Sequence, residues 1–193
     1  VSDLIGSSTN YDFDIIPSSD GEITVNIISG EASDLAGNGT VAHDAPLART
    51  YDGTRPTPVI ASGLSNPTSA PLITGTVEFD EAVTGFDETD LEVTNATVIS
   101  FGGGGASYTF ELEPEIDGEV TVDVNVNEAT DAAGNGNLAA ETFSRMSDTT
   151  PPTILMDSTT SAPPATTNTF PIPVTVTFGE DVPGFTVDDI AIP

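Results

Sequence analysis

Acidic and amide side chains recur at the ends of expected β-strands and in the segments that join them. The chain of 193 residues has 31 Asp and Glu residues against three Arg and no Lys, a formal net charge of −28 at pH 7. Oxygen donors of this kind, several of them anionic, are what Ca²⁺ takes in sets of about six to eight. The candidate metal ligands are Asp52, Glu81, Asp87, Asp90, Asp131, Asn135, Asp148, Glu180, Asp188 and Asp189.

A second interpretation of these residues is purely structural, because Asp and Asn often cap tight turns. It fits Asp34 and Asp131 best, since each opens a D-x-A-G-N-G segment. No segment has the ligand spacing of an EF-hand loop, so calcium is indicated by the type of ligand rather than by a motif. Both interpretations stay open at this point.

Catalytic chemistry has little support in the sequence. The sequence has no Cys, and it lacks the G-x-S-x-G turn that carries the nucleophilic serine of many hydrolases. Its single histidine, His43, is replaced by Ala140 in the internal repeat described below. Paired carboxylates serve glycosidases, but such a pair needs a cleft that a linear array of sandwiches does not offer. We therefore expect a protein that is not an enzyme.

The charge also excludes classes of partner. Nucleic acid needs clustered cations to bind its phosphates, and an anionic membrane surface repels an acidic chain. The sequence holds no apolar run of about 18 residues, so we expect no membrane span. Strong self-repulsion destabilises a compact state, which indicates that cations compensate.

The elements that would position the carboxylates follow from an internal repeat. Residues 11–39 return as residues 108–136, 97 positions later, and the linker that begins at Asp52 returns at Asp148. Residues 77–93 return as residues 176–192. A period near 97 residues matches one whole β-sandwich domain rather than a solenoid repeat.

Alternating apolar and polar residues between turn residues predict the strands of the complete repeat. Val120, Val122, Val124 and Val126 alternate with polar residues, which predicts one buried face. We expect a turn at residues 102–105, and strands at residues 58–62, 72–79, 90–93, 97–101, 108–113, 119–126 and 141–146.

Seven antiparallel strands bring the chain in at one end of a sandwich and out at the other. The loop at residues 80–89, the loop at residues 131–137 and the incoming linker then meet at the entry end. This arrangement gathers Asp52, Glu81, Asp87, Asp90, Asp131 and Asn135. The corresponding residues of the next junction are Asp148, Glu180, Asp188 and Asp189.

Five ordered segments carry a family resemblance: residues 79–91, 108–110, 117–122, 131–136 and 148–153. Together they resemble the bacterial Ig-like repeats of large surface proteins, over essentially the whole chain. Two departures are Arg55, where the second linker has Pro151, and Gly179, which replaces Asp80. The resemblance implies stalk or spacer modules of adhesins, surface fibres and envelope proteins, many of which are stiffened by calcium.

The expected fold is all-β: tandem immunoglobulin-like β-sandwich domains, one complete and two partial. Residues 1–55 are the C-terminal half of one domain, residues 56–152 a complete domain, and residues 153–193 the N-terminal half of the next. Two arrangements fit, a window of a longer array, which we favour, and subunits in which one copy completes the next.

We expect a structural module of a long extracellular array on the cell surface, a stalk or filament stiffened by Ca²⁺ at its junctions. Its expected partners are neighbouring repeats or copies of itself, head to tail. The alternative is an adhesin module that binds a glycan or a protein surface of a host.

Overall fold

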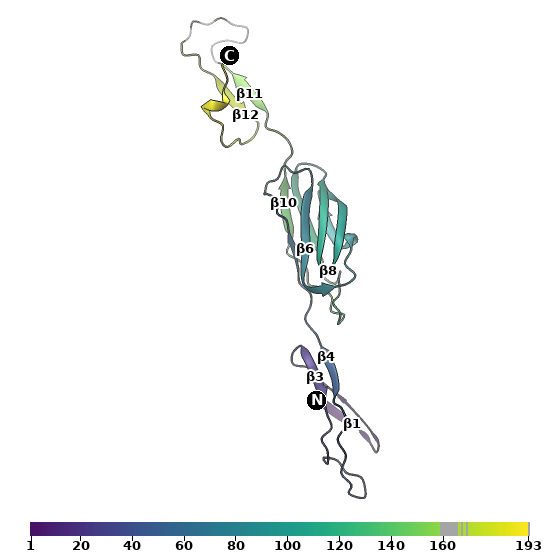
Figure 1. Ribbon diagram of the computed structural model, residues 1–193. Coiled ribbons are helices and arrows are strands. Elements are labelled where there is room, and N and C mark those ends of the chain that lie inside the picture. Colours follow the sequence, from purple (N-terminus) through teal and green to yellow (C-terminus); the bar gives the residue numbers. More distant parts are fainter. Residues whose placement is uncertain (159–165, 167, 169, 193) are drawn as a thin grey trace. The chain divides into compact units, whose positions relative to one another are not determined.

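The computed structural model describes residues 1–158, 166, 168 and 170–192, and its regular structure is almost entirely β-strand (Figure 1). The chain divides into two compact units, Val1–Ser147 and Asp148–Pro193. The only helical elements in the described ranges are two 3-10 turns, η1 (Glu88–Asp90) and η2 (Val187–Asp189). No helix in these ranges is long and apolar enough to cross a membrane.

The segment predicted as the complete domain forms two sheets of antiparallel strands. One sheet has the order β5 (Pro58–Ala61), β6 (Ile73–Val83), β8 (Ala96–Pro114), and the other has the order β10 (Phe143–Ser147), β9 (Gly118–Val124), β7 (Leu91–Thr94). The sheets enclose one apolar core, so the prediction of an Ig-like β-sandwich is confirmed.

The core follows from the alternation within the strands. Ile73 and Val77 of β6 and Val120 and Val122 of β9 are fully buried, while their neighbours along each strand face outward. The predicted burial of Val126 is wrong, because β9 ends at Val124 and the Val126 side chain is 50% exposed.

An aromatic group closes one part of this core. Phe86, in the loop after β6, packs edge-on against Tyr108 of β8, with ring centroids 4.9 Å apart, and against Phe79 of β6, 5.2 Å away. Edge-to-face pairs of this kind add to the gain from burial. They hold the loop after β6 close to the sandwich.

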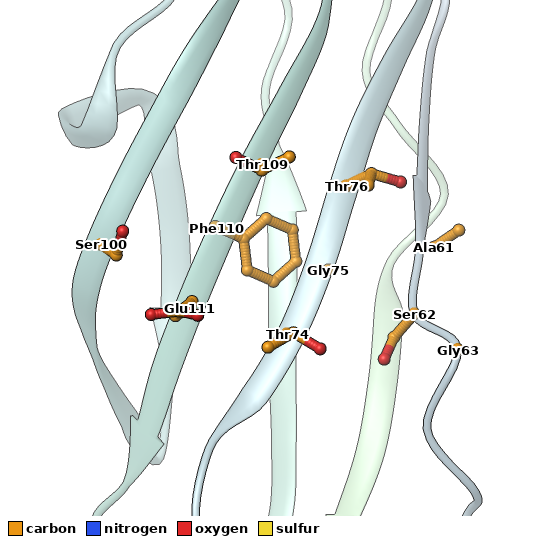
Figure 2. Close-up of a pocket in the computed structure, with 10 residues that line it drawn as sticks. All are labelled: Ala61, Ser62, Gly63, Thr74, Gly75, Thr76, Ser100, Thr109, Phe110 and Glu111. Carbon is orange, nitrogen blue, oxygen red and sulfur yellow. The ribbon is translucent and has the colours of Figure 1, made fainter.

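The four glycines predicted as a turn lie within one long strand, β8. Its two halves lie side by side in Figure 2, where Ser100 stands on the ribbon next to that of Thr109 and Phe110. Gly103 has φ 121° and lies so close to the returning half that an added Cβ would be 2.7 Å from the Tyr108 Cα. The reversal is therefore built into the strand and needs glycine there.

The first 52 residues form two hairpins, β1 (Ser2–Ser7) with β2 (Asn10–Asp14) and β3 (Gly21–Val25) with β4 (Leu47–Tyr51). In the second hairpin Gly21 pairs with Tyr51 and Val25 with Leu47. The register is the one that β9 and β10 have at the repeat-equivalent residues, so this hairpin is built as in the complete domain.

The second unit contains the hairpin of β11 (Ile154–Asp157) and β12 (Thr175–Phe178), followed by η2. Ile154 pairs with Phe178 and Asp157 with Thr175, the register that β5 and β6 have at the equivalent residues. Phe178 and Phe185 form an edge-on pair at 5.0 Å, as Phe79 and Phe86 do. Residues 159–165, 167, 169 and 193 of the predicted C-terminal half lie outside the described residues. The predicted domain boundaries stay a prediction.

Candidate metal centre

Three carboxylates from separate parts of the sequence converge in the first unit. Asp52 comes from the segment after β4, Glu81 from the end of β6, and Asp131 from the loop between β9 and β10. One oxygen of each lies within 4.8 Å of the others. The Asp131 side chain is buried, and those of Asp52 and Glu81 are half-buried. We call these three residues the acidic cluster.

The position of Asp131 is set by the D-x-A-G-N-G turn that it opens. Its Oδ1 accepts the backbone N–H of Ala133 and of Asn135, both at 2.8 Å. Its Oδ2 accepts the Asn135 Nδ2 at 2.9 Å. Gly134 takes φ 94°, which allows the turn to close. The turn-capping interpretation of Asp131 is therefore right, and it coexists with a place in the cluster.

Asp34 is held in the same way in the partial domain. Its Oδ1 accepts from the N–H of Ala36 at 2.9 Å and of Asn38 at 2.8 Å, and its Oδ2 from the Asn38 Nδ2 at 2.9 Å. The side-chain bond from Asn38, and then the backbone bonds, hold the pKa of Asp34 below its usual value. The repeated motif thus encodes a repeated turn.

Two sets of hydrogen bonds position β6, which carries Glu81, against this turn and against the linker that carries Asp52. Thr84, after β6, exchanges backbone hydrogen bonds of 2.8 and 2.9 Å with Thr130, next to Asp131. On the linker side, the N–H of Thr57 donates to the Asp80 Oδ1 at 2.8 Å. The loop after β6 is therefore tied to the turn of Asp131, and β6 is tied to the linker that follows Asp52.

The electrostatics of the cluster are those of anions held close together. Burial raises the pKa of Glu81, and the charges of Asp131 and Asp52 raise it further. Burial acts in the same direction on Asp131, but the bonds from Asn135, Gly134 and Ala133 together outweigh it and hold the pKa of Asp131 below its usual value. Glu81 is thus the member whose charge the site tolerates least.

Asn135, the fourth predicted ligand of this group, lies at the cluster as a hydrogen-bond donor. Its Nδ2 donates to the backbone carbonyl of Asp52 at 3.1 Å as well as to Asp131.

Arg55 anchors the linker to the loop that follows Asn135. Its Nε donates to the Gly136 carbonyl at 2.6 Å, and an NH2 group donates to the Asn137 carbonyl at 2.7 Å.

Asp87 and Asp90, the other two residues predicted for this site, cap the 3-10 turn η1. Asp87 caps η1 by accepting the Thr89 N–H at 2.8 Å, and its own N–H donates to the Asp90 Oδ2 at 2.7 Å. Asp90 also shares a hydrogen bond with Glu128 that raises the pKa of Glu128. A reciprocal cap of this kind explains both aspartates locally, and neither belongs to the acidic cluster.

The residues predicted for the second junction do not form such a group. Asp189 accepts the Thr186 N–H at 2.9 Å and helps to cap η2, as Asp90 does at η1. Asp148 accepts the Thr150 N–H at 3.3 Å. Glu180 and Asp188 are exposed, and within the described residues the acidic cluster at Asp52 is the sole group of three close carboxylates.

Sequence reasoning missed two acidic residues beside the cluster, Asp20 and Asp80. Asp20 accepts the Gly53 N–H at 2.7 Å and also bonds the Thr54 hydroxyl, next to Asp52. Both add to the negative charge that raises the pKa of Glu81. The signal for Asp20 was present, because its Asp-Gly pair repeats as Asp117-Gly118.

A shallow hollow of about 370 Å³ lies elsewhere in the complete domain, on the sheet of β5, β6 and β8 (Figure 2). Thr76 and Thr109 are paired across β6 and β8, and Thr74 stands opposite Glu111. The Phe110 ring packs over Gly75 within the core and is buried, and the lining includes the hydroxyls of Ser62, Thr74 and Thr76 and the carboxylate of Glu111. Such a surface offers hydrogen bonds but no exposed aromatic ring for stacking.

Comparison with known proteins matches residues 52–146 to a family of bacterial Ig-like domains. The match begins at Asp52 of the acidic cluster and ends one residue before the end of β10. Neither the curated proteins nor the solved structures gave a significant match.

Proposed function

Residues 52–146 form a bacterial Ig-like domain, and from this premise we propose that the chain is a structural module of a long extracellular tandem array. In such an array the domains form a stalk or filament, and calcium stiffens the junctions between them. Bacterial Ig-like domains are common in surface or extracellular proteins and are typically not enzymes. The proposal places this chain at the cell surface in a mechanical role.

The observation that carries the proposal is the origin of the three carboxylates. Asp52 belongs to the linker, whereas Glu81 and Asp131 belong to the sandwich that follows it. A cation bound by all three would therefore join the linker to the domain. The donor set fits calcium, since it consists of carboxylate oxygens with more oxygen donors close by, on Asp20 and Asp80.

The physical effect of the cation would be twofold. It would neutralise carboxylates whose mutual repulsion opposes folding, and it would restrict the rotation of the linker. Stabilisation by a ligand that binds only the folded state grows with its concentration, by about 2.7 kcal/mol at 100 times the dissociation constant. The stiffening and the stabilisation would thus appear together.

Calcium titration followed by calorimetry and thermal melting tests this proposal. We expect Ca²⁺ to raise the melting temperature and excess chelator to reverse the change, at constant ionic strength. Glu81→Gln should abolish most of the response, while Glu113→Gln, which removes one exposed carboxylate of β8, should keep it. Equal responses in both variants would leave only general charge screening.

A second candidate function is that of an adhesin module that binds a glycan or a protein surface. The hollow around Thr74, Thr76 and Thr109 favours it, because Pro173 and Asp12 stand at the repeat positions of Thr74 and Thr109. A feature present in one repeat and absent from the others is expected of a binding site. Binding to a glycan array that is lost in Thr109→Asp would support this function.

A further inference from the structure

The outer edge of β10 in the complete domain borders an open cleft. β10 is an end strand of its sheet, and β5 is an end strand of the other sheet. A cleft of about 500 Å³ lies between them, lined by residues 57–60 on one side and by residues 139 and 141–145 on the other. Ile60 and Phe143, which pack against the core, are only partly buried there. An open strand edge of this kind is a template for pairing with another chain.

The backbone of this edge is free to bond at Thr142 and Ser144. Met146 turns its backbone away from β9, because its N–H donates to the Asn66 Oδ1 and its carbonyl accepts from the Thr68 N–H, both at 2.9 Å. Residues two apart along a strand direct their backbone groups to the same side. The groups of Ser144 and Thr142 therefore point to the open edge, which the segment at Asn66 and Thr68 covers only beside Met146.

Three side chains stand in line along the same edge. Glu141, Phe143 and Arg145 are two residues apart, and all three line the cleft. The guanidinium of Arg145 lies over the Phe143 ring, with its Cζ 5.0 Å from the ring centroid. An NH2 group of Arg145 donates to the Ser62 carbonyl at 3.1 Å, while the Nε has no hydrogen-bond partner among the described residues. The edge thus presents an acid, an aromatic ring and a base, in that order.

This order is complementary to itself when the strand is reversed. In an antiparallel pair of β10 strands centred on Phe143, Glu141 of each copy lies opposite the partner's Arg145. The two Phe143 rings then face each other, and cross-strand aromatic pairs are favourable. The same register sets Thr142 opposite the partner's Ser144, the two residues whose backbone groups are free. A parallel pair in register would set Glu141 against the partner's Glu141, which like charges oppose.

We propose that the edge of β10 is an interface between two copies of this chain, paired antiparallel about Phe143 and joined by two ion pairs between Glu141 and Arg145. The interface is isologous, because the same residues serve on both copies. Main-chain hydrogen bonds at residues 142–144 hold the strands together, and the ion pairs fix the direction and the partner. The contact joins two arrays side by side, whereas the proposed calcium site acts along one array.

The pattern is particular to the complete domain. The hairpin of β3 and β4 has the register of β9 and β10, so the equivalents of the three side chains are Ala45, Leu47 and Arg49. The base is kept there, but the acid is replaced by alanine. A reversed copy of that edge would leave Arg49 without an acidic partner, so the ion pairs select for the edge of the complete domain.

Sedimentation velocity of the whole chain tests the proposal. Each copy carries a charge of −28, so the measurement is made at about 0.15 M salt, where the Debye length is about 8 Å. Pairing over a short edge is weak, so the protein is taken to about 1 mM, which detects a free energy near −4 kcal/mol. We expect the mean mass to rise with concentration above the 19.8 kDa of one chain.

Charge exchange between Glu141 and Arg145 is the decisive comparison. Glu141→Arg sets Arg against Arg, and Arg145→Glu sets Glu against Glu, so each should weaken self-association by about tenfold or more. An equimolar mixture of the two variants restores both ion pairs and should form a 1:1 dimer. Glu113→Arg on β8 and Arg49→Glu on β4 change the charge equally at other places and should associate as the unmodified protein does.

Disulfide trapping checks the register and does not depend on the folding of the Arg145→Glu variant. The chain has no cysteine of its own, so mild oxidation of a mixture of Thr142→Cys and Ser144→Cys copies should yield the mixed dimer. Thr109→Cys, on the exposed face of β8, in place of Thr142→Cys should yield about tenfold less or lower still, because Thr109 lies away from this edge.

A monomer at every concentration, or a mixture of the two charge variants that associates no better than each alone, would overturn the interface. Trapping that is no better with Thr142→Cys than with Thr109→Cys would overturn the register. Either failure leaves the proposed role of calcium untouched, because Glu141 and Arg145 lie outside the acidic cluster, which is tested by titration.

Discussion

The Nδ2 of Asn135 donates at once to the Oδ2 of Asp131, at 2.9 Å, and to the backbone carbonyl of Asp52, at 3.1 Å. A single amide thus joins the buried carboxylate of the acidic cluster to the linker that brings in the third carboxylate. The same amide at Asn38 bonds Asp34 in the partial domain.

Asn135→Ala should destabilise the complete domain by about 1 to 2 kcal/mol, because it removes two hydrogen bonds and leaves a buried carboxylate with fewer donors. Chemical denaturation followed by tyrosine fluorescence measures the change. Asn38→Ala is the matched control, since it alters the same turn where the side chains are exposed. An equal loss in the two variants would mean that the link to the linker contributes nothing.

Arg55→Ala should loosen the linker, because the guanidinium donates to Gly136, Asn127 and Asn137 in the loop before β10. A hydrogen bond to a charged group contributes at most about 1.5 to 3 kcal/mol. The net gain for the linker is smaller, because the Arg55 guanidinium bonds water when the linker is free. We expect faster cleavage near residue 55 in limited proteolysis, with little change in the melting of the sandwich. Arg49→Ala serves as the comparison, and unchanged cleavage in Arg55→Ala would refute the anchoring role.

The pH dependence of stability should be set by Glu81 and Asp131 in opposite directions. The raised pKa of Glu81 contributes stability that is present below the usual glutamate pKa of 4.5 and is lost as the pH rises through the folded value. The lowered pKa of Asp131 contributes stability that is present above 3.8 and is lost as the pH falls through its folded value.

Without calcium, Glu81→Gln should therefore raise the melting temperature at pH 7, and the gain should shrink as the pH falls through the raised folded pKa of Glu81 toward 4.5. Melting curves between about pH 3 and 7 in chelator follow the difference between the variant and the unmodified protein. The control variant Glu113→Gln should show no such pH-dependent gain in melting temperature. A gain that grows on acidification would contradict the assignment to Glu81.

Gly75→Ala should destabilise the domain by about 1 to 3 kcal/mol, because the added methyl group meets the Phe110 ring in a closed core. The Ala61 carbonyl, 2.9 Å from the same position, prevents the strand from moving away. Phe110→Leu should relieve part of the cost when the two changes are combined, and a double-mutant cycle measures this coupling. Additive effects would show that the two residues do not constrain each other.

The local features of this protein were determined by its sequence alone. The alternation at Val120, Val122 and Val124 predicted the buried face of β9, and the D-x-A-G-N-G motif predicted the turns at Asp34 and Asp131. Such features depend on neighbours within a few residues, because side chains alternate along a strand and an aspartate caps its own turn. The period of the repeat also indicated the size of the domain before any strand was paired.

Distances between remote segments were decided only by the tertiary structure. Asp87 and Asp90 were expected beside Asp52, Glu81 and Asp131, but the structure has them capping the 3-10 turn η1, because residue types that bind a cation also cap such turns. Asp20 was missed because its approach to Glu81 depends on how the hairpin, the linker and β6 pack. Alternation does not report where a strand ends, so Val126 was assigned to the core. Pairing across a sandwich is a property of whole strands, and it brings Asp52, Glu81 and Asp131 together although they are far apart along the chain.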